Sequence, residues 1–480
     1  MKHFPALLAL CLAALAAPAA AQPAELALAH VTIVDVESGA LRPDQTVLIR
    51  GGRIAWTGPA AEARVPAGAR VVDATGRYAI PGLWDMHVHT SREGRALHFW
   101  PQFLAYGVTG VREMGSYLDS LQYWRARARQ PGSGAPRIVY SSPMLDGNPP
   151  SWRHGYGVAD SAAAVVAVDS MAALGFDFLK VYNRLSRDAY FAIARRARER
   201  GIPFAGHVPN AVTPLEASDA GQRSIEHLGD RLFIACLPGG KPLFDAFLAA
   251  RASGASPDST QALFRRLTEL ALAGPDAAAC RPMFDRFAAN GTWLTPTLTV
   301  HRGQHPSDEL AADSRLRFVP PVLAQRWASG RDSGEEAEME RRIAQQMARL
   351  VGLAQEAGVG ILAGTDASDE PYVFAGSGVH DELALLVDAG LTPLQALRAA
   401  TLSPARYLGA ADSMGTVAAG RVADLVLLDA NPLDDIRNTV RIFAVVHAGR
   451  LIDAAERERL LRLAEQEAAR AATAPPARQD

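Results

Sequence analysis

Short apolar segments alternate with helical segments from about residue 81 onward, and this alternation is the feature that most limits the possible folds of the chain. The eight apolar segments read LWDMHVH, VTGVREM, RIVYSS, FLKVY, PFAGHV, SIEHL, TWLTPTL and GILAGTDA. Helical stretches such as SRDAYFAIARRARERG and PLEASDAG lie between them. Repeated strand–helix units favour a parallel sheet, and eight such units are the number that closes a (β/α)₈ TIM barrel.

Both flanks of this region have the pattern of a β domain. Residues 26–80 contain LALAHVTIVD, QTVLIRGGRIAWTG and RVVDATGRYAI, which are rich in Val and Ile and are separated by glycine turns. DLVLLD and IFAVVHAGRLID repeat this pattern near the other end of the chain. We therefore predict an α/β protein with a small β-sandwich built from residues 22–80 and 412–453. The barrel would occupy residues 81–411, and a C-terminal helix and tail would follow over residues 454–480.

The first 21 residues have the plan of a secretory signal peptide. Lys2 is followed by the apolar run ALLALCLAALAA, and an A-x-A cleavage signal ends at Ala21. The apolar run is too short to cross a bilayer as a helix. The sequence thus predicts export to the periplasm or the medium, with no membrane attachment after cleavage. Cys236 and Cys280 remain after cleavage and either form a disulfide in an oxidising compartment or stay separate thiols.

The overall composition is that of a globular protein, with 49% hydrophobic residues, 21% charged residues and a net charge of -2. Because there is no basic excess, we expect no nucleic-acid partner. Two segments, residues 229–291 and 300–357, are longer than ordinary connections in a barrel. They are expected to form the mouth or lid of a binding site, or contacts within a homo-oligomer.

Polar or charged side chains end five of the eight apolar segments. They are His87 and His89 on the first, Lys180 on the fourth, His207 on the fifth, His227 on the sixth and Asp366 on the eighth. In barrel enzymes the catalytic groups lie at this end of the strands, and residues two apart on a strand share one face. Burying such groups without partners costs several kcal/mol each, a cost that a shared metal centre offsets. Nitrogen and oxygen ligands suit Zn²⁺, with Mn²⁺ or Fe²⁺ as alternatives.

Lys180 is unusual because the chain hardly uses lysine. Only three of its 49 basic residues are lysines, namely Lys2, Lys180 and Lys241. A guanidinium group stays charged, whereas a buried amine can lose its proton and act as a nucleophile. The residue is therefore either a reactive amine or a lysine that is buried and paired for structural reasons.

These residues together resemble the metal-dependent amidohydrolase superfamily. The resemblance rests on the ordered set HVH, K, H, H, D and on the closing stretch GTVAAGRVADLVLLDANP. IPGLWDMHVH, LKVY, GHV, IEHL and AGTDAS are most similar to its prolidase-like and imidazolonepropionase-like exported members, which are binuclear. The resemblance implies two divalent ions, with Zn²⁺ expected, held by His87, His89 and Asp366 on one side and by His207 and His227 on the other. It also implies that Lys180 is carbamylated by CO₂ and bridges the two ions.

The resemblance further implies that a metal-bridging hydroxide attacks the substrate carbonyl. Asp366 would accept the proton of this hydroxide and pass it to the leaving nitrogen, and Tyr182 would donate a hydrogen bond to the carbonyl oxygen. Candidates for substrate binding are Arg153, His154 and Tyr156 in the loop NPPSWRHGYG, and His301 and Arg302 after the seventh strand. For each of these the alternative is a solvated or packing role.

The expected reaction is cleavage of an amide or peptide C–N bond in a small-molecule or short-peptide substrate, such as a dipeptide, an Xaa-Pro dipeptide or an N-acyl amino acid. One alternative is a mononuclear deaminase or cyclic-amide hydrolase of the same superfamily. Deaminases of this fold usually place a Glu three residues after the fifth-strand histidine, where this chain has Asn210, and Lys180 also argues against that alternative. A second alternative is a non-catalytic binding protein on a barrel that has lost its activity, but all six site residues are present.

Overall fold

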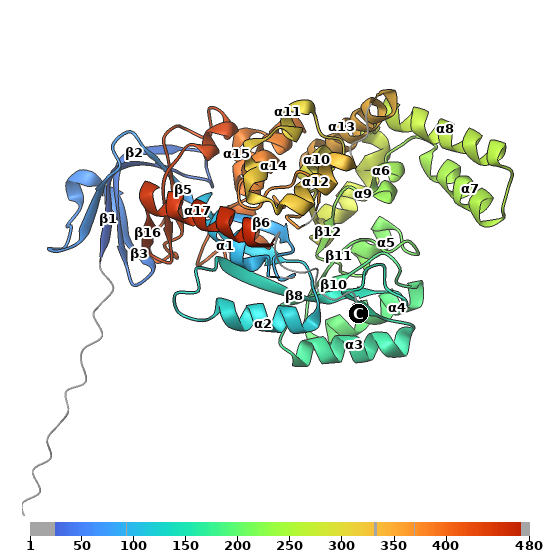
Figure 1. Ribbon diagram of the computed structural model, residues 1–480, viewed down its shortest axis with the longest axis horizontal. Coiled ribbons are helices and arrows are strands. Elements are labelled where there is room, and N and C mark those ends of the chain that lie inside the picture. The colour runs from blue at the N-terminus through green and yellow to red at the C-terminus, as the bar shows by residue number, and fades with distance from the viewer. Residues whose placement is uncertain (1–24, 93, 331–333, 369, 472–480) are drawn as a thin grey trace, which may run out of the picture.

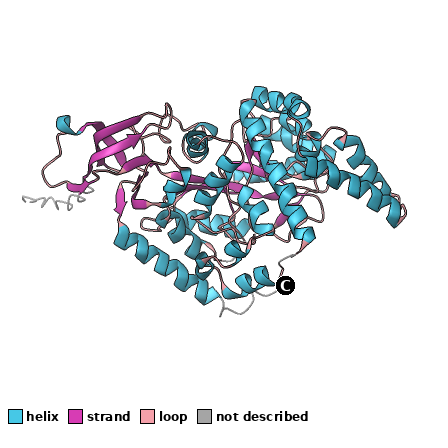
Figure 2. Ribbon diagram, turned by 90° about the horizontal axis from the view of Figure 1, so that it is seen from above, coloured by secondary structure: helices cyan, strands magenta, loops and turns pink. Residues whose placement is uncertain are grey.

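The structure is a computed structural model that describes residues 25–471, except for positions 93, 331–333 and 369. The predicted signal peptide, residues 1–21, and the end of the predicted tail lie outside the described residues. A helix-wrapped barrel lies in the centre of the molecule, a β domain lies at one side, and a pair of helices projects at the other (Figures 1 and 2).

Seven parallel strands form the wall of the barrel in the order of the chain. They are β6 (Leu83–Val88), β7 (Val108–Glu113), β8 (Arg137–Asp146), β10 (Phe178–Val181), β11 (Phe204–Gly206), β12 (Ser224–Glu226) and β13 (Trp293–Thr295). A short strand, β9 (Gly155–Gly157), pairs with the end of β8. Because both faces of these strands are covered, they are almost continuously apolar, as the sequence indicated.

The predicted eighth strand closes the barrel, but it does so through isolated bridges. Ile361 bridges to Leu294 beside β13, and Ala367 bridges to Val88 on β6. In addition, the backbone N–H of Asp366 donates to the carbonyl of His87 at 2.8 Å. The TIM-barrel prediction is therefore confirmed, with an irregular last segment that carries a site residue.

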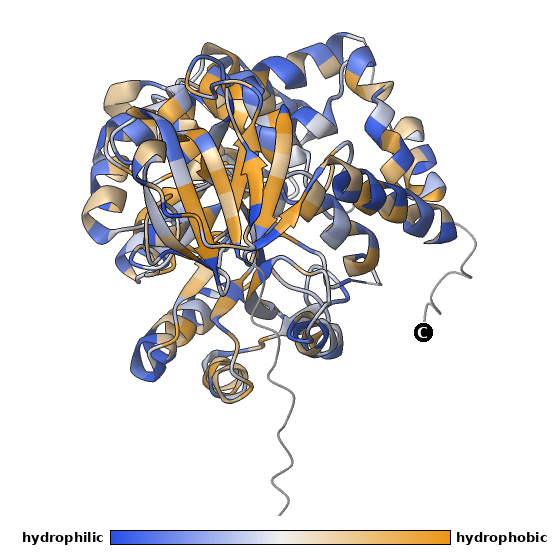
Figure 3. Cartoon of the chain, turned by 90° about the vertical axis from the view of Figure 1, so that its left-hand side faces the viewer, coloured by the Kyte–Doolittle hydropathy of each residue, from blue (hydrophilic) through white to orange (hydrophobic). Residues whose placement is uncertain are grey.

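The β domain is one mixed sheet that contains strands from both ends of the chain, as predicted. Its strands are β1 (Leu26–Val34), β2 (Leu41–Arg50), β3 (Arg53–Pro59), β4 (Arg70–Asp73), β5 (Tyr78–Pro81), β14 (Leu425–Leu428), β15 (Ile442–His447) and β16 (Arg450–Ile452). The two ends meet where β5 pairs antiparallel with β14. Figure 3 shows that hydrophobic residues dominate these strands, and Leu28, Ile33 and Leu427 belong to their common core.

Helices cover the outside of the barrel. They include α1 (Ala96–Ala105), α2 (Leu118–Ala128), α3 (Ser161–Ala173), α4 (Arg187–Arg200), α5 (Pro214–Asp219), α14 (Gly378–Asp388), α15 (Pro393–Ala399), α16 (Leu402–Tyr407) and the C-terminal α17 (Ala454–Ala471). Helix α4 shows why the chain forms such elements, because the Ser186 hydroxyl caps its start and Gly201, at φ 65°, ends it. None of the helices in the described part of the chain is both long and apolar enough to cross a membrane.

The two long segments fold into helices at the open end of the barrel. The first contains α6 (Asp230–Ala235), α7 (Gly240–Ala252), α8 (Pro257–Ala273) and α9 (Ala277–Asn290), and the second contains α10 (Leu298–Gln304), α11 (Asp308–Ala311), α12 (Pro321–Ser329) and α13 (Glu335–Glu356). Helices α7 and α8 form the projecting hairpin (Figures 1 and 2). A disulfide joins Cys236, which precedes this hairpin, to Cys280, which follows it. The structure thus selects the disulfide from the two states that the sequence left open.

Removing the disulfide is expected to destabilise the protein. The bond closes a loop with a sequence separation of 44 residues, and loop entropy alone predicts a loss of about 4 kcal/mol in the free energy of unfolding. The measurement is urea unfolding of the Cys236→Ala/Cys280→Ala variant without reductant. Dithiothreitol should lower the stability of the unmodified protein to that of the variant and leave the variant unchanged. Equal stability of both proteins without reductant would contradict a formed disulfide.

Candidate metal centre

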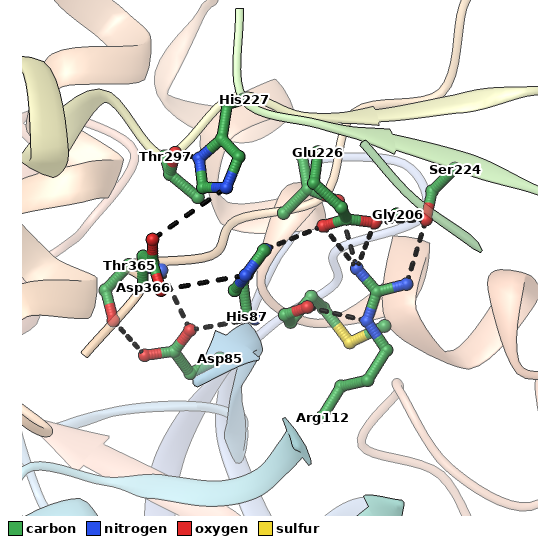
Figure 4. Close-up of polar contacts among 12 residues, drawn as sticks. Asp85, His87, Arg112, Gly206, Ser224, Glu226, His227, Thr297, Thr365 and Asp366 are labelled. Carbon is green, nitrogen blue, oxygen red and sulfur yellow. Dashed lines mark hydrogen bonds and ion pairs between the residues drawn. The ribbon is translucent and has the colours of Figure 1, made fainter. Parts of the chain in front are cut away.

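The carboxylate of Asp366 lies among three of the predicted histidines, two of which, His87 and His227, are drawn in Figure 4. Its Oδ1 atom is 3.3 Å from Nε2 of His89 and 3.6 Å from Nε2 of His87. Its Oδ2 atom is 3.8 Å from Nε2 of His227. The first, sixth and eighth segments of the barrel therefore bring their polar ends to one point, as parallel strands with a common direction require.

The remaining predicted metal ligands lie beside this group. The ring of His207 is 4.7 Å from the ring of His227 between centroids. Lys180 lies on β10 and is fully buried, and its Nζ atom is 6.0 Å from the centre of the Tyr182 ring. That ring is in turn 4.2 Å from the ring of His207. The side chains named from the fourth and fifth segments thus adjoin those from the first, sixth and eighth.

A second residue holds each of the four histidines through Nδ1. The pairs are His87 with Glu226 at 2.9 Å, His89 with the carbonyl of Gly115 at 2.7 Å, His207 with Oδ1 of Asn183 at 2.9 Å, and His227 with Oγ1 of Thr297 at 2.6 Å. A carboxylate or carbonyl oxygen only accepts hydrogen bonds, so Nδ1 of His87 and of His89 carries the proton. The Nε2 atom then presents a lone pair, which is the arrangement that metal-binding histidines use.

Three buried polar atoms at this point have no hydrogen-bond partner among the described residues. They are Nε2 of His87, Nζ of Lys180 and Oδ1 of Asp366. Leaving such atoms unsatisfied is costly, and a bound cation would satisfy the nitrogen and oxygen lone pairs. Ligand atoms of His87, His227 and Asp366 also lie within 4.8 Å of one another, which makes them a candidate metal site. The residues present therefore fit a divalent metal, and a donor set of nitrogen and oxygen atoms suits Zn²⁺.

Burial sets the protonation of this group. Desolvation lowers the pKa of His87, His89 and His207 well below 6.5 and that of His227 to about 3, so the imidazoles stay neutral, the form that binds metal. Burial likewise raises the pKa of Asp366 well above its usual value. For Lys180, burial lowers the pKa to about 8 although the negative charges of Glu226 and Asp366 act in the opposite direction.

A buried ion pair in the barrel interior holds one histidine of the candidate centre in place. Arg112, on β7, donates through Nη2 to both carboxylate oxygens of Glu226 at 2.9 and 2.8 Å, and both side chains are 0% exposed. Arg112 also donates to the carbonyl of Met86 at 2.6 Å and to the hydroxyl of Tyr407 at 2.9 Å. Because Glu226 in turn holds His87, the position of this imidazole depends on a salt bridge across the barrel interior (Figure 4).

The backbone at Asp366 and His227 is strained. Asp366 has φ 60° and His227 has φ 65°, the left-handed region that side chains other than glycine rarely adopt. Such conformations persist only where the surroundings over-determine them. Asp85 contributes here, because its carboxylate accepts hydrogen bonds from the backbone N–H of Thr365 at 2.9 Å and from the Thr365 hydroxyl at 2.6 Å. Residue 366 is thus held against β6 by its immediate neighbour.

A cavity of about 830 Å³ opens above the centre. Its wall includes His207 and Asp366 from the centre, Tyr182 and His301 among the other predicted residues, and Trp152 and Phe244, which were not predicted. Because α6, α7, α10 and α12 all contribute lining residues, the two long segments do shape the mouth, as expected.

The other predicted substrate-binding residues do not line this cavity. Arg153 is exposed and Tyr156 packs against the core beside β8. His154 is buried under Trp152, with the rings stacked at 6.1 Å. Arg302 forms an ion pair with Asp381 at 2.7 Å.

Three residues that the structure places at the site were not predicted from the sequence, namely Arg112, Glu226 and Trp152. Glu226 lies inside the quoted SIEHL and Arg112 inside VTGVREM, so a charged residue within an apolar strand was the available signal for both. Trp152 was visible as the large aromatic residue of the NPPSWRHGYG loop.

Breaking the buried ion pair should cost far more stability than breaking an exposed one. Glu226→Gln leaves the Arg112 charge buried without its partner, and we expect a loss of about 3–5 kcal/mol. The matched control is Asp245→Asn, which removes the exposed Lys241–Asp245 pair and should cost less than about 1 kcal/mol. The measurement is urea unfolding with a chelator present, so that metal affinity does not contribute. Equal losses for the two variants would contradict the supporting role of the pair.

The chain is similar in sequence to several known proteins. Residues 78–452 match the model of the amidohydrolase family. The imidazolonepropionase of Ralstonia nicotianae is 27% identical over 396 residues, which cover 80% of this chain and 86% of that protein. Adenine deaminase 3 of Rhizobium meliloti is 43% identical, but only over 68 residues, which are 14% of this chain and 11% of the deaminase.

Two solved structures share the fold over nearly the whole chain. A bottromycin amidohydrolase has a TM-score of 0.69 and 26% identity and covers 95% of each chain. A Xaa-Pro dipeptidase with bound methionine in its active site has a TM-score of 0.63 and 19% identity, and covers 90% of this chain and all of the other. The predicted superfamily is confirmed, and because the family model matches most of the sequence, the chain belongs to the amidohydrolase family.

Proposed function

We propose that this protein is a metal-dependent hydrolase that cleaves an amide or peptide C–N bond in a small substrate. The observation that carries the proposal is the group of histidines around Asp366, each held through Nδ1 by another residue. This orientation prepares the imidazoles to bind metal, and the buried lysine beside them has no hydrogen-bond partner among the described residues and is free to become a bridging ligand.

The proposed centre holds two divalent ions, most simply Zn²⁺, and a carbamate on Lys180. His87, His89 and Asp366 would hold one ion, and His207 and His227 the other. The neutral Lys180 amine would attack CO₂, forming an N–C bond and releasing one proton, and the resulting carbamate anion would bridge the ions. Arginine cannot form this anion and would place a permanent cation between two dications.

The ions would supply a reactive water at neutral pH and would polarise the substrate carbonyl. The chain's own residues complete the reaction. Asp366 accepts the proton of the attacking water and delivers it to the leaving nitrogen. The hydroxyl of Tyr182, on the cavity wall, donates a hydrogen bond to the carbonyl oxygen as negative charge develops there.

The proposed substrates are dipeptides, including Xaa-Pro dipeptides, and N-acyl amino acids. A cavity of about 830 Å³ has room for molecules of this size. The likeness to a Xaa-Pro dipeptidase and to a bottromycin amidohydrolase supports an amide bond as the target. The deaminase alternative has less support, because the matched segment is short and because Asn210, on the cavity wall, cannot replace a glutamate in proton transfer.

Metal content tests the two-ion centre. We expect two equivalents per chain in the unmodified protein, with hydrolysis of dipeptides or N-acyl amino acids that is lost on chelation. Lys180→Arg should fold but bind less metal and lose most of its activity, because it cannot supply the bridging anion. Lys180→Ala should regain part of its activity when a short carboxylic acid is added. Full metal content and full activity in Lys180→Arg would overturn the bridge, and one equivalent of metal in the unmodified protein would favour the mononuclear alternative.

We also propose that the protein is exported. The basic and apolar pattern of the first 21 residues supports this, and so does a disulfide in the folded chain, because disulfides persist in oxidising compartments. Sequencing the N-terminus of protein from the periplasmic or culture fraction should give Gln22 as the first residue. A product that keeps Met1 and stays in the cytoplasm would contradict export.

A further inference from the structure

The loop NPPSWRHGYG reaches the cavity through a tryptophan that was not predicted from the sequence. Trp152 is 53% exposed, yet its indole lies on the cavity wall. Its Nε1 atom is 2.8 Å from the hydroxyl oxygen of Tyr182. We propose that Trp152 is a positioning residue that turns the Tyr182 hydroxyl proton toward the substrate. The inference rests on the proposed function, in which the Tyr182 hydroxyl donates a hydrogen bond to the substrate carbonyl.

The direction of this hydrogen bond follows from the chemistry of the indole. The Nε1–H of tryptophan donates and has no capacity to accept. The Tyr182 oxygen must therefore be the acceptor, and its single proton is left to point elsewhere. Without the indole, the Tyr182 hydroxyl could donate its hydrogen bond to a neighbouring acceptor or to water instead. With the indole in place, Tyr182 keeps its proton available for an oxygen in the cavity, which both residues line.

The contact between the two side chains is built into the fold. Asp146, at the end of β8, is 1% exposed. One of its carboxylate oxygens accepts the backbone N–H of Ser151, next to Trp152, at 2.6 Å, and the other accepts the N–H of Arg184, two residues after Tyr182, also at 2.6 Å. A single buried carboxylate thus ties the loop of the tryptophan to the segment of the tyrosine.

Both rings are also fixed by their neighbours. The indole stacks on the buried His154 ring, with 19° between the planes, and His154 in turn meets the ring of Tyr117 at 5.7 Å. On the other side, the Tyr182 ring lies 4.2 Å from the ring of His207. The hydrogen bond therefore joins two side chains that are each held by packing, which lowers the entropy lost when it forms.

The first test detects the hydrogen bond without relying on activity. The chain has seven tryptophans, so the indole N–H region of a ¹⁵N NMR spectrum is simple, and the Trp152 signal is the one that disappears in Trp152→Phe. In Tyr182→Phe this signal should move upfield, because the indole loses its acceptor. The control is Tyr123→Phe, which makes the same change at an exposed tyrosine elsewhere in the chain and should leave the signal in place. An unmoved signal in Tyr182→Phe would overturn the proposal.

The second test asks whether Trp152 acts through Tyr182. Trp152→Phe keeps an aromatic ring over His154 but removes the donor, and we expect kcat to fall about tenfold with little change in KM. Tyr182→Phe should lower kcat about a hundredfold. The double variant should be no worse than Tyr182→Phe alone, because the indole then has nothing to orient. Metal content should be unchanged in all three variants, and all three should unfold cooperatively, with no more loss of stability than one hydrogen bond provides.

The outcomes separate this inference from the proposed function. The positioning role is wrong if the double variant loses more activity than Tyr182→Phe alone. It is also wrong if Trp152→Phe keeps the full kcat while Tyr182→Phe loses activity. In both cases the hydrolase proposal stands. If Tyr182→Phe keeps its full rate, the proposed hydrogen bond to the carbonyl is wrong, and the inference falls with it. The metal content and activity of the Lys180 variants test the two-ion centre independently of Trp152 and Tyr182.

Discussion

The ion pair between Arg112 and Glu226 is the interaction on which the rest of the site depends. It spans the barrel interior from the second strand to the sixth with no exposure to water. Ion pairs of this kind add little net stability, but they penalise any arrangement that separates the charges. The pair therefore selects one relative position of β7 and β12. Glu226 also accepts a hydrogen bond from His87, so the relative position of these two strands fixes the position of one imidazole of the candidate metal centre.

The same rule, that a buried polar group must find a partner, explains what was predictable from the sequence. Few folds other than a barrel with converging strand ends give partners to the polar side chains that end these apolar strands, namely His89, Lys180, His207, His227 and Asp366. The fold class was therefore readable from the pattern, and the structure confirms it. The two cysteines were undecided because pairing depends on the spatial proximity of residues far apart in the chain, which spacing does not reveal.

The residues that escaped prediction have a common physical character. Arg112 and Trp152 act through partners distant in sequence, so their own segments show an unusual charged or aromatic residue but not what it contacts. The irregular eighth segment is a related case, because GILAGTDA has the composition of a strand while the left-handed backbone at Asp366 interrupts its ladder. At this point Asp85, on β6, accepts hydrogen bonds from the backbone N–H and the hydroxyl of Thr365. Local propensity describes what a segment prefers, and the site is where tertiary contacts override that preference.

The hairpin that the disulfide closes has a consequence for how the protein should be made. Phe244 and Leu248 on α7 form part of the cavity wall, whereas the candidate metal ligands all come from barrel strands and the turns that follow them. The crosslink therefore constrains the wall that receives a substrate without touching the groups that would perform the chemistry. Material folded in a reducing cytoplasm is expected to bind cations normally while recognising its substrate poorly. Expression host is thus an experimental variable for this chain, and a weak turnover measured on cytosolic material would say nothing about its true specificity.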